Sequence, residues 1–199
     1  MALEKQQTLV NDHPTRGAAN PAPLFAFRTM RAKEHAAVSL NREEALRYLG
    51  YSGQVIDDEL VARLESMATI CEKGLKPTFT WRVFAIDEQR CRWDENPCIA
   101  LEGTSLSFEG KSINTHLRGA RFAACFAATL GAESERQVRT LAATNPLDAM
   151  LYDACCNALI EEVAQAAQDD IAREAAQAGL FARMRFSPGY GDLPLAIQP

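Results

Sequence analysis

Residues 78–86, TFTWRVFAI, and the long stretch at 146–178, PLDAMLYDACCNALIEEVAQAAQDDIAREAAQA, decide the fold class of this chain. In the first stretch, β-branched and aromatic side chains alternate along the chain, which is typical of a strand. In the second, Asn145 and Pro146 supply an N-cap and a first helical residue, and Gly179 ends the pattern. We therefore expect one strand and one long helix here.

Further elements are predicted on both sides of these two stretches. Capping residues and apolar spacing of 3.6 residues predict helices that begin after Asn41 and Asp57, and further helices at 112–117 and 134–143, the last capped by Ser134. Alternating or short apolar runs predict strands at 98–102, 105–108, 121–130 and 180–186. The order of helices and strands lacks regular βαβ alternation. We therefore predict a single α+β domain, a mainly antiparallel twisted sheet with flanking helices and one long C-terminal helix.

The N-terminal part of the chain differs in composition from the rest. Residues 1–35 are rich in Ala, Pro and Asn and show no sustained hydrophobic period. We expect them to form a flexible or loosely docked extension, and residues 36–199 to form the domain.

Composition limits the classes of partner. The chain has 199 residues, 47% of them hydrophobic, and a net charge of -5, so it has no broad basic surface for nucleic acid or anionic lipid. No apolar run approaches the roughly 20 residues of a membrane-spanning helix, and the N-terminus lacks an apolar signal-peptide core. We expect a cytoplasmic protein with neither a nucleic-acid nor a membrane partner.

The cysteines and histidines do not predict a metal site. The six cysteines have no CxxC spacing, and the three histidines do not cluster beside them. We expect reduced thiols that pack as small apolar side chains, at Cys71, Cys91, Cys98, Cys125, Cys155 and Cys156.

The first candidate site is the segment 183–192, RMRFSPGYGD. If 180–186 is a strand, Arg183 and Arg185 point to one face directly before a turn. The turn contains one proline and two glycines, so main-chain N–H groups can approach a ligand, and the Tyr190 ring offers a stacking surface. Arginine has the fork geometry that suits a carboxylate. The alternative is an ordinary turn with solvated arginines.

The second candidate lies on the long helix. Glu161 and Glu162 fall within an arc of apolar residues formed by Met150, Leu151, Ala154, Cys155, Ala158 and Leu159. A buried carboxylate requires an arginine, a backbone group or a ligand cation as its partner. The alternative is a glutamate at the solvent edge. No dinucleotide, nucleoside triphosphate or hydrolase motif is present, so we predict no catalytic residues.

Several segments resemble stand-alone relatives of the activation domain of cobalamin-dependent methionine synthase, which binds S-adenosylmethionine. The resemblance begins near residue 38 and is carried by 41–54 (NREEALRYLGYSGQ), 56–60 (IDDEL), 129–131 (TLG), the helix at 153–163, and 185–195 (RFSPGYGDLPL). The last segment is the most specific, because Arg-x-x-Pro-Gly-Tyr is that family's S-adenosylmethionine signature.

The resemblance implies a function within a methionine synthase or corrinoid methyltransferase system rather than a self-contained enzyme. Such domains deliver a methyl group from S-adenosylmethionine to cobalamin carried by a partner, after its cobalt has been oxidised to the inactive +2 state. A flavodoxin-type protein supplies the electron. The implied partner is a corrinoid-binding protein or a methionine synthase that lacks its own activation domain.

The resemblance also assigns ligand contacts residue by residue, to Arg185, Ser187, Gly189, Tyr190 and Glu161. A shift of one residue in the alignment would replace Glu161 by Glu162. Relatives continue through a further helix and strand beyond the motif, so we expect the C-terminal end of this domain, at Pro199, to be incomplete relative to the family.

Two other interpretations remain open at the level of sequence. One is a module that binds S-adenosylmethionine or a corrinoid protein without catalysis, and the other is an unrelated α+β protein with a coincidental turn. Methyl delivery to a bulky corrinoid requires direct access, so this function predicts exposed apolar or aromatic surface near Tyr190.

Overall fold

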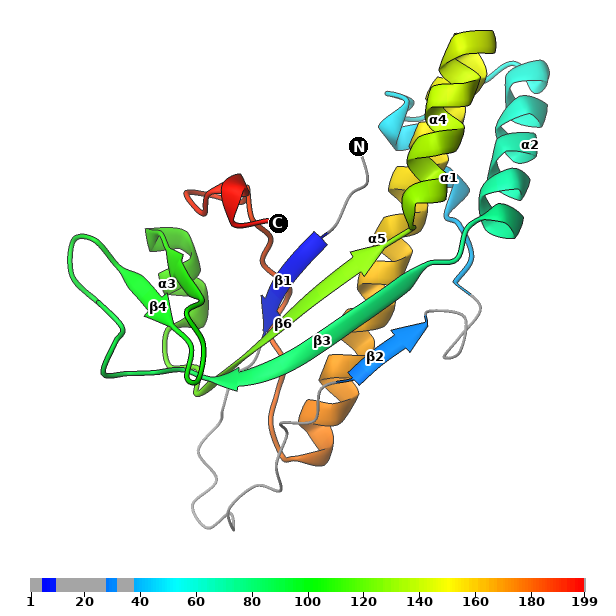
Figure 1. Cartoon of the computed structure of the whole chain (residues 1–199). Coiled ribbons are helices and arrows are strands. Elements are labelled where there is room, and N and C mark those ends of the chain that lie inside the picture. The colour runs from blue at the N-terminus through cyan, green and yellow to red at the C-terminus, as the bar shows by residue number, and fades with distance from the viewer. Residues whose placement is uncertain (1–4, 10–27, 32–37, 199) are drawn as a thin grey trace. The chain divides into compact units, whose positions relative to one another are not determined.

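The computed structural model in Figure 1 describes residues 5–9, 28–31 and 38–198. The chain divides into two compact units. Of the described residues, unit 1 comprises 30–31, 38–79 and 128–166, and unit 2 comprises 5–9, 28–29, 80–127 and 167–198. Each unit draws on distant parts of the sequence, so neither can be cut out as one continuous segment.

The larger sheet has four strands in the order β1-β6-β3-β2. The arrows of β3 and β6 point in opposite directions (Figure 1). Strands β3 and β6 confirm the predictions at 78–86 and 121–130. The bounds of the four strands are β1 Lys5–Leu9, β2 Arg28–Arg31, β3 Thr78–Ala85 and β6 Phe122–Thr129.

Strands β1 and β2 were not predicted, because both lie in the stretch that we expected to be a loose extension. Their sequences, KQQTL and RTMR, are mostly polar and too short to show an apolar period. These two segments therefore belong to the sheet. The other residues of 1–37 lie outside the described part of the chain.

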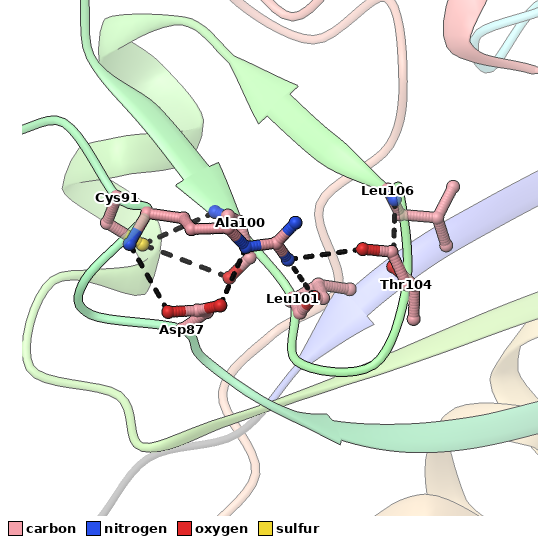
Figure 2. Close-up of polar contacts among 7 residues, drawn as sticks. Asp87, Cys91, Ala100, Leu101, Thr104 and Leu106 are labelled. Atoms are coloured by element: carbon pink, nitrogen blue, oxygen red, sulfur yellow. Dashed lines mark hydrogen bonds and ion pairs between the residues drawn. The ribbon is translucent and has the colours of Figure 1, made fainter.

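A second sheet pairs β4, Cys98–Ala100, with antiparallel β5, Ser107–Glu109. Arg90 holds the turn between them: its Nη2 donates to the carbonyl oxygens of Leu101 at 2.5 Å and Thr104 at 3.1 Å, and its Nε donates to Asp87 at 2.6 Å. Figure 2 shows Leu101 and Thr104 on this turn and Asp87 on a separate stretch of the chain beside it. The strands predicted at 98–102 and 105–108 are therefore both present, with bounds that differ by one or two residues.

The described residues contain five α-helices, all at predicted places. Their bounds are α1 Arg42–Tyr48, α2 Asp58–Gly74, α3 Lys111–Leu117, α4 Ala132–Thr144 and α5 Pro146–Gln177. A short 3-10 turn follows at Leu195–Ile197. The expected α+β fold with a long C-terminal helix is confirmed.

Helix caps explain where most of these helices begin. The side chain of Asn41 accepts from the backbone N–H of Glu44 at 3.1 Å, and that of Asp57 accepts from Glu59 at 2.7 Å, as predicted. The predicted cap at Ser134 is wrong. Helix α4 begins after Gly131, and the Ser134 hydroxyl donates back to the Gly131 carbonyl at 2.7 Å from inside the first turn.

Helix α5 supplies much of the buried apolar surface of unit 1. Leu151, Tyr152, Cys155 and Leu159 are buried. The predicted apolar arc is wrong at Met150, whose side chain is 55% exposed. Ala149, which the predicted arc did not include, is buried, so the buried face of the helix passes on both sides of Met150 in the sequence.

Arg42 and Glu72 connect α1 to α2. The Arg42 guanidinium donates to the two Glu72 carboxylate oxygens at 2.7 and 3.2 Å, and the Leu40 N–H donates to the same carboxylate at 3.0 Å. Hydrogen bonding from Arg42 is the main cause that lowers the pKa of Glu72 below its ordinary value.

This lowered pKa predicts a pH dependence. The stabilisation from the charged Glu72 is fully present above the unfolded pKa of about 4.3 and is lost as the pH falls through the lower folded pKa. The free energy of unfolding, measured by urea titration, should therefore differ between wild type and Glu72→Gln at pH 7, and this difference should shrink below about pH 4. The exposed residue Glu43 gives the control for loss of a surface carboxylate, since Glu43→Gln should change the free energy of unfolding at pH 7 less than Glu72→Gln does. A difference for Glu72→Gln that is constant with pH would contradict the prediction.

The core of unit 2 gathers apolar side chains around β4, β5, α3 and the C-terminal segment. Its buried members are Ile86, Ile99, Leu101, Phe108, Ile113, Leu117, Ala120, Ala123 and Leu193. Asp170 is buried at 2% exposure and accepts from the Trp81 indole N–H at 2.8 Å and from Arg173 at 2.8 Å. Leu193 is one of these buried residues. It therefore fixes the segment that follows α5 against this core.

All six cysteines are free thiols. Cys71 and Cys156 lie with their sulfur atoms 3.4 Å apart in unit 1, and burial together with this contact raises the pKa of Cys71. Within the described part of the chain, no group of three or more His, Cys, Asp or Glu side chains could hold a metal ion. In this same part of the chain, no helix combines the length and the apolar composition that a membrane span requires.

Candidate functional site

The predicted strand at 180–186 is wrong. After Gly179, whose φ of +71° suits a residue without a Cβ, Phe181 makes a bridge and residues 182–187 have no regular structure. Alternating side chains are compatible with a strand, but a strand also requires a neighbour for its backbone hydrogen bonds. Side-chain contacts to α3 position this segment instead.

Arg183 makes the first of these contacts. Its Nη1 donates to the carbonyl oxygen of His116, and its Nη2 donates to that of Arg118 at 3.0 Å. These carbonyls lie at the C-terminal end of α3, where a guanidinium is favourable. The prediction that Arg183 and Arg185 point to one face depended on the strand at 180–186, which is absent, and Arg183 contacts the end of α3 instead. Arg185 is half-buried.

A tight turn follows from Ser187 to Leu193, as the sequence predicts. Backbone hydrogen bonds join Gly189 N to Leu193 O at 2.9 Å, Tyr190 N to Ser187 O at 3.0 Å, and Leu193 N to Tyr190 O at 3.1 Å. Gly189 has a φ of +87° and Gly191 a φ of +55°, which other residues rarely adopt. Ser187, at the start of the turn, is buried.

Asp192 fixes the far end of the turn. Its carboxylate accepts from the backbone N–H of Lys111 at 2.6 Å and of Ser112 at 2.9 Å, at the start of α3. These backbone hydrogen bonds, Ser112 first, lower the pKa of Asp192. Sequence reasoning missed this role, because no local pattern connects residue 192 to residue 111.

Aromatic side chains lie on both sides of the turn. The Phe186 ring is 5.1 Å from the His116 ring and 6.0 Å from the Tyr190 ring, which meets it edge-on. Tyr190 is 56% exposed and Met184 is 79% exposed. The expected exposed surface near Tyr190 is therefore present.

Glu161 and Glu162 are both half-buried on α5, in unit 1. Glu161 accepts from the Tyr48 hydroxyl on α1 at 3.3 Å. The structure thus gives this carboxylate a protein partner, a hydroxyl that the sequence analysis did not consider. The other four predicted site residues lie together in the C-terminal segment of unit 2.

Two surface cavities lie in unit 2, and only the first reaches the predicted segment 183–192, at Asp192. The first, of about 240 Å³, is lined by Arg92, Glu95, Asn96, Pro97, Glu109, Gly110, Lys111 and Asp192. The second, of about 720 Å³, is lined by Ala85, Ile86, Asp87, Glu88, Gln89, Glu102, Gly103, Arg121 and Phe122. Neither contains Arg185, Ser187, Gly189 or Tyr190, so the candidate site is the exposed turn rather than these cavities.

The fold and this turn define an α+β protein with a glycine-rich loop held against a short helix. Among solved structures, the chain is similar to a crystal structure of the MetH reactivation domain bound to AdoHcy. The sequence identity is 14% and the TM-score is 0.48. The match covers 76% of this chain and 56% of that chain, so this chain spans little more than half of the other's length. No family model matches the chain, and no curated protein matches it.

Proposed function

We propose that this chain is an S-adenosylmethionine-binding module whose turn at Ser187–Leu193 receives the ligand. The proposal rests mainly on one observation: the Pro-Gly-Tyr part of the Arg-x-x-Pro-Gly-Tyr sequence lies in a hydrogen-bonded turn, and Tyr190 in that turn is exposed. Because the backbone of the turn is already fixed, binding requires little further ordering.

The side chains of the segment suit the chemistry of this ligand. S-adenosylmethionine carries a carboxylate, for which the Arg185 fork is suited, and an adenine ring, for which the exposed Tyr190 ring offers a stacking face. Gly189 lets the main chain approach the ligand closely, since it has no side chain. Ser187 is proposed to contact the ligand through its backbone.

The resemblance assigns Glu161 to the ammonium or sulfonium of the ligand, and because Glu161 belongs to unit 1 we propose and test this contact separately from the turn of unit 2. Glu161→Gln removes the charge and keeps the shape, so we expect the dissociation constant to rise by about tenfold or more. Glu162→Gln is the matched control and should bind as wild type, which calorimetric titration would measure. If Glu162→Gln weakens binding and Glu161→Gln does not, the ligand contact belongs to Glu162. If neither variant changes the affinity, no glutamate of this pair binds the ligand.

We further propose that the bound ligand serves reductive methylation of a corrinoid on a partner protein. S-adenosylmethionine supplies the methyl group, and the chain's own task is to hold the methylsulfonium in position. No general acid or base is needed from this chain. The proposed partners are a corrinoid-binding protein, or a methionine synthase without its own activation domain, and a flavodoxin-type electron donor.

A turnover experiment tests this function. The full chain is mixed with a cobalamin-loaded methionine synthase fragment that lacks its activation domain, reduced flavodoxin and S-adenosylmethionine. We expect the absorption spectrum of methylcobalamin to appear, and to require both this chain and S-adenosylmethionine. If the ligand binds but no methylcobalamin forms, reactivation of this cobalamin protein is contradicted, and the chain acts as a binding module.

A further inference from the structure

The C-terminal segment contacts both ends of α3. At the C-terminal end of the helix, Arg183 donates to the carbonyls of His116 and Arg118. At the N-terminal end, the Asp192 carboxylate accepts from the N–H groups of Lys111 and Ser112. A positive group therefore meets the negative end of the helix dipole, and a negative group meets the positive end.

Helix α3 has little stability of its own. It has seven residues, and its N-cap, Gly110, provides no side-chain hydrogen bond. A helix of this length is marginal in isolation, and its first N–H groups and last carbonyls need partners. Arg183 and Asp192 supply partners at both ends, so α3 depends on the segment that carries the turn.

The contact between the turn and α3 is close enough to require glycine. A Cβ at Gly110 would lie 2.9 Å from an oxygen of Asp192, and one at Gly191 would lie 2.6 Å from the Cβ of Ser112. Both glycines have positive φ, +138° and +55°. Each glycine therefore lies against a side chain of the other segment, at a place where a Cβ of its own would clash with that side chain.

We infer that Arg183 and Asp192 are positioning residues, which hold the Ser187–Leu193 turn in its conformation by clamping the two ends of α3. The turn and α3 then form one cooperative unit, and weakening either end of the clamp loosens both. The consequence for ligand binding rests on the proposed function, but the coupling itself does not.

Hydrogen exchange of the full chain, followed amide by amide, tests the coupling. The amides of Gly189 and Leu193 bond to acceptors within the turn, so neither Arg183→Ala nor Asp192→Ala removes their acceptors directly. We expect each variant to lower the protection of these two amides by about tenfold or more. Glu88→Ala, which removes an exposed carboxylate of the same unit, should leave them unchanged.

One pattern of hydrogen exchange would overturn the inference. If Gly189 and Leu193 keep their protection in both variants while only α3 loses protection, the clamp is a helix cap and the inference is wrong. Amides of α2 report whether the rest of the chain stays folded. If either alanine variant unfolds, Asp192→Asn and Arg183→Lys replace it in the same experiment. Loss of amide protection that is confined to α3 and the turn supports the inference, and any other pattern overturns it.

Titration of S-adenosylmethionine gives the second readout. Asp192→Ala should bind about tenfold more weakly than wild type, and Asp192→Asn, which keeps a carbonyl acceptor, should fall between them. Affinity unchanged in Asp192→Ala would overturn the role in ligand positioning. If wild type does not bind S-adenosylmethionine, the proposed function fails, and the exchange data still decide the coupling.

Discussion

Replacing Arg185 with alanine is expected to weaken S-adenosylmethionine binding by about tenfold to hundredfold, or roughly 1.5 to 3 kcal/mol. The reason is that a charge-assisted, two-pronged contact to the ligand carboxylate would be lost. Arg185→Lys should restore little of this affinity, because an ammonium lacks the planar fork. Isothermal calorimetry on the three proteins measures the effect.

Met184 provides the matched control for this experiment. It precedes Arg185 in the segment and is largely exposed, so Met184→Ala should bind as wild type and unfold at the same temperature. Arg183→Ala would not be neutral, since Arg183 contacts the end of α3. Unchanged affinity in Arg185→Ala, in a protein that melts normally, would remove Arg185 from the site.

The largest effect on stability is expected for Leu151→Ala, at about 2 to 5 kcal/mol in the free energy of unfolding. Leu151 is buried in unit 1, so truncation removes apolar contacts and leaves a cavity. Its neighbour Met150 is mostly exposed, and Met150→Ala should change the free energy by only about 0.5 kcal/mol or less. Urea unfolding followed by circular dichroism measures both.

The pair also tests how α5 is oriented about its axis. The sequence pattern places Met150 and Leu151 on the same apolar arc, whereas the structure buries only Leu151. Equal losses in the two variants would contradict the structure and favour the pattern.

Local signals predicted the helices well. Asn41 and Asp57 cap α1 and α2 through contacts to residues two or three positions away, which a sequence displays directly. Helix α4 is an instructive exception. Gly131 adopts a φ of +83° and the helix begins immediately after it, so the capping pattern at Ser134 is embedded in the first turn.

Strand predictions were correct where a segment has its own apolar pattern. They failed where strand formation depends on hydrogen bonding to a neighbouring strand. Strands β3 and β6 carry their own buried pattern. Strands β1 and β2 are short and polar, and they exist as strands through their neighbours in the sheet. The alternation at 180–186 had the spacing of a strand, yet this segment is held mainly by side-chain contacts.

The candidate site was predictable in outline only. Proline and two glycines in sequence indicate a turn, and the turn at Ser187–Leu193 is present. The partners of Arg183 and Asp192 were not predictable, because they are backbone groups of α3, more than 60 residues earlier in the chain. The close approach of Gly110 and Gly191 depends on the folded chain in the same way.

Calorimetric titration of S-adenosylmethionine into the full wild-type chain tests the central proposal most directly. We predict saturable binding at one site with a dissociation constant below about 1 mM, and displacement by S-adenosylhomocysteine, which shares the carboxylate and the adenine. A folded protein, as judged by circular dichroism, that gives no saturable heat at ligand concentrations up to about 1 mM would contradict the proposal.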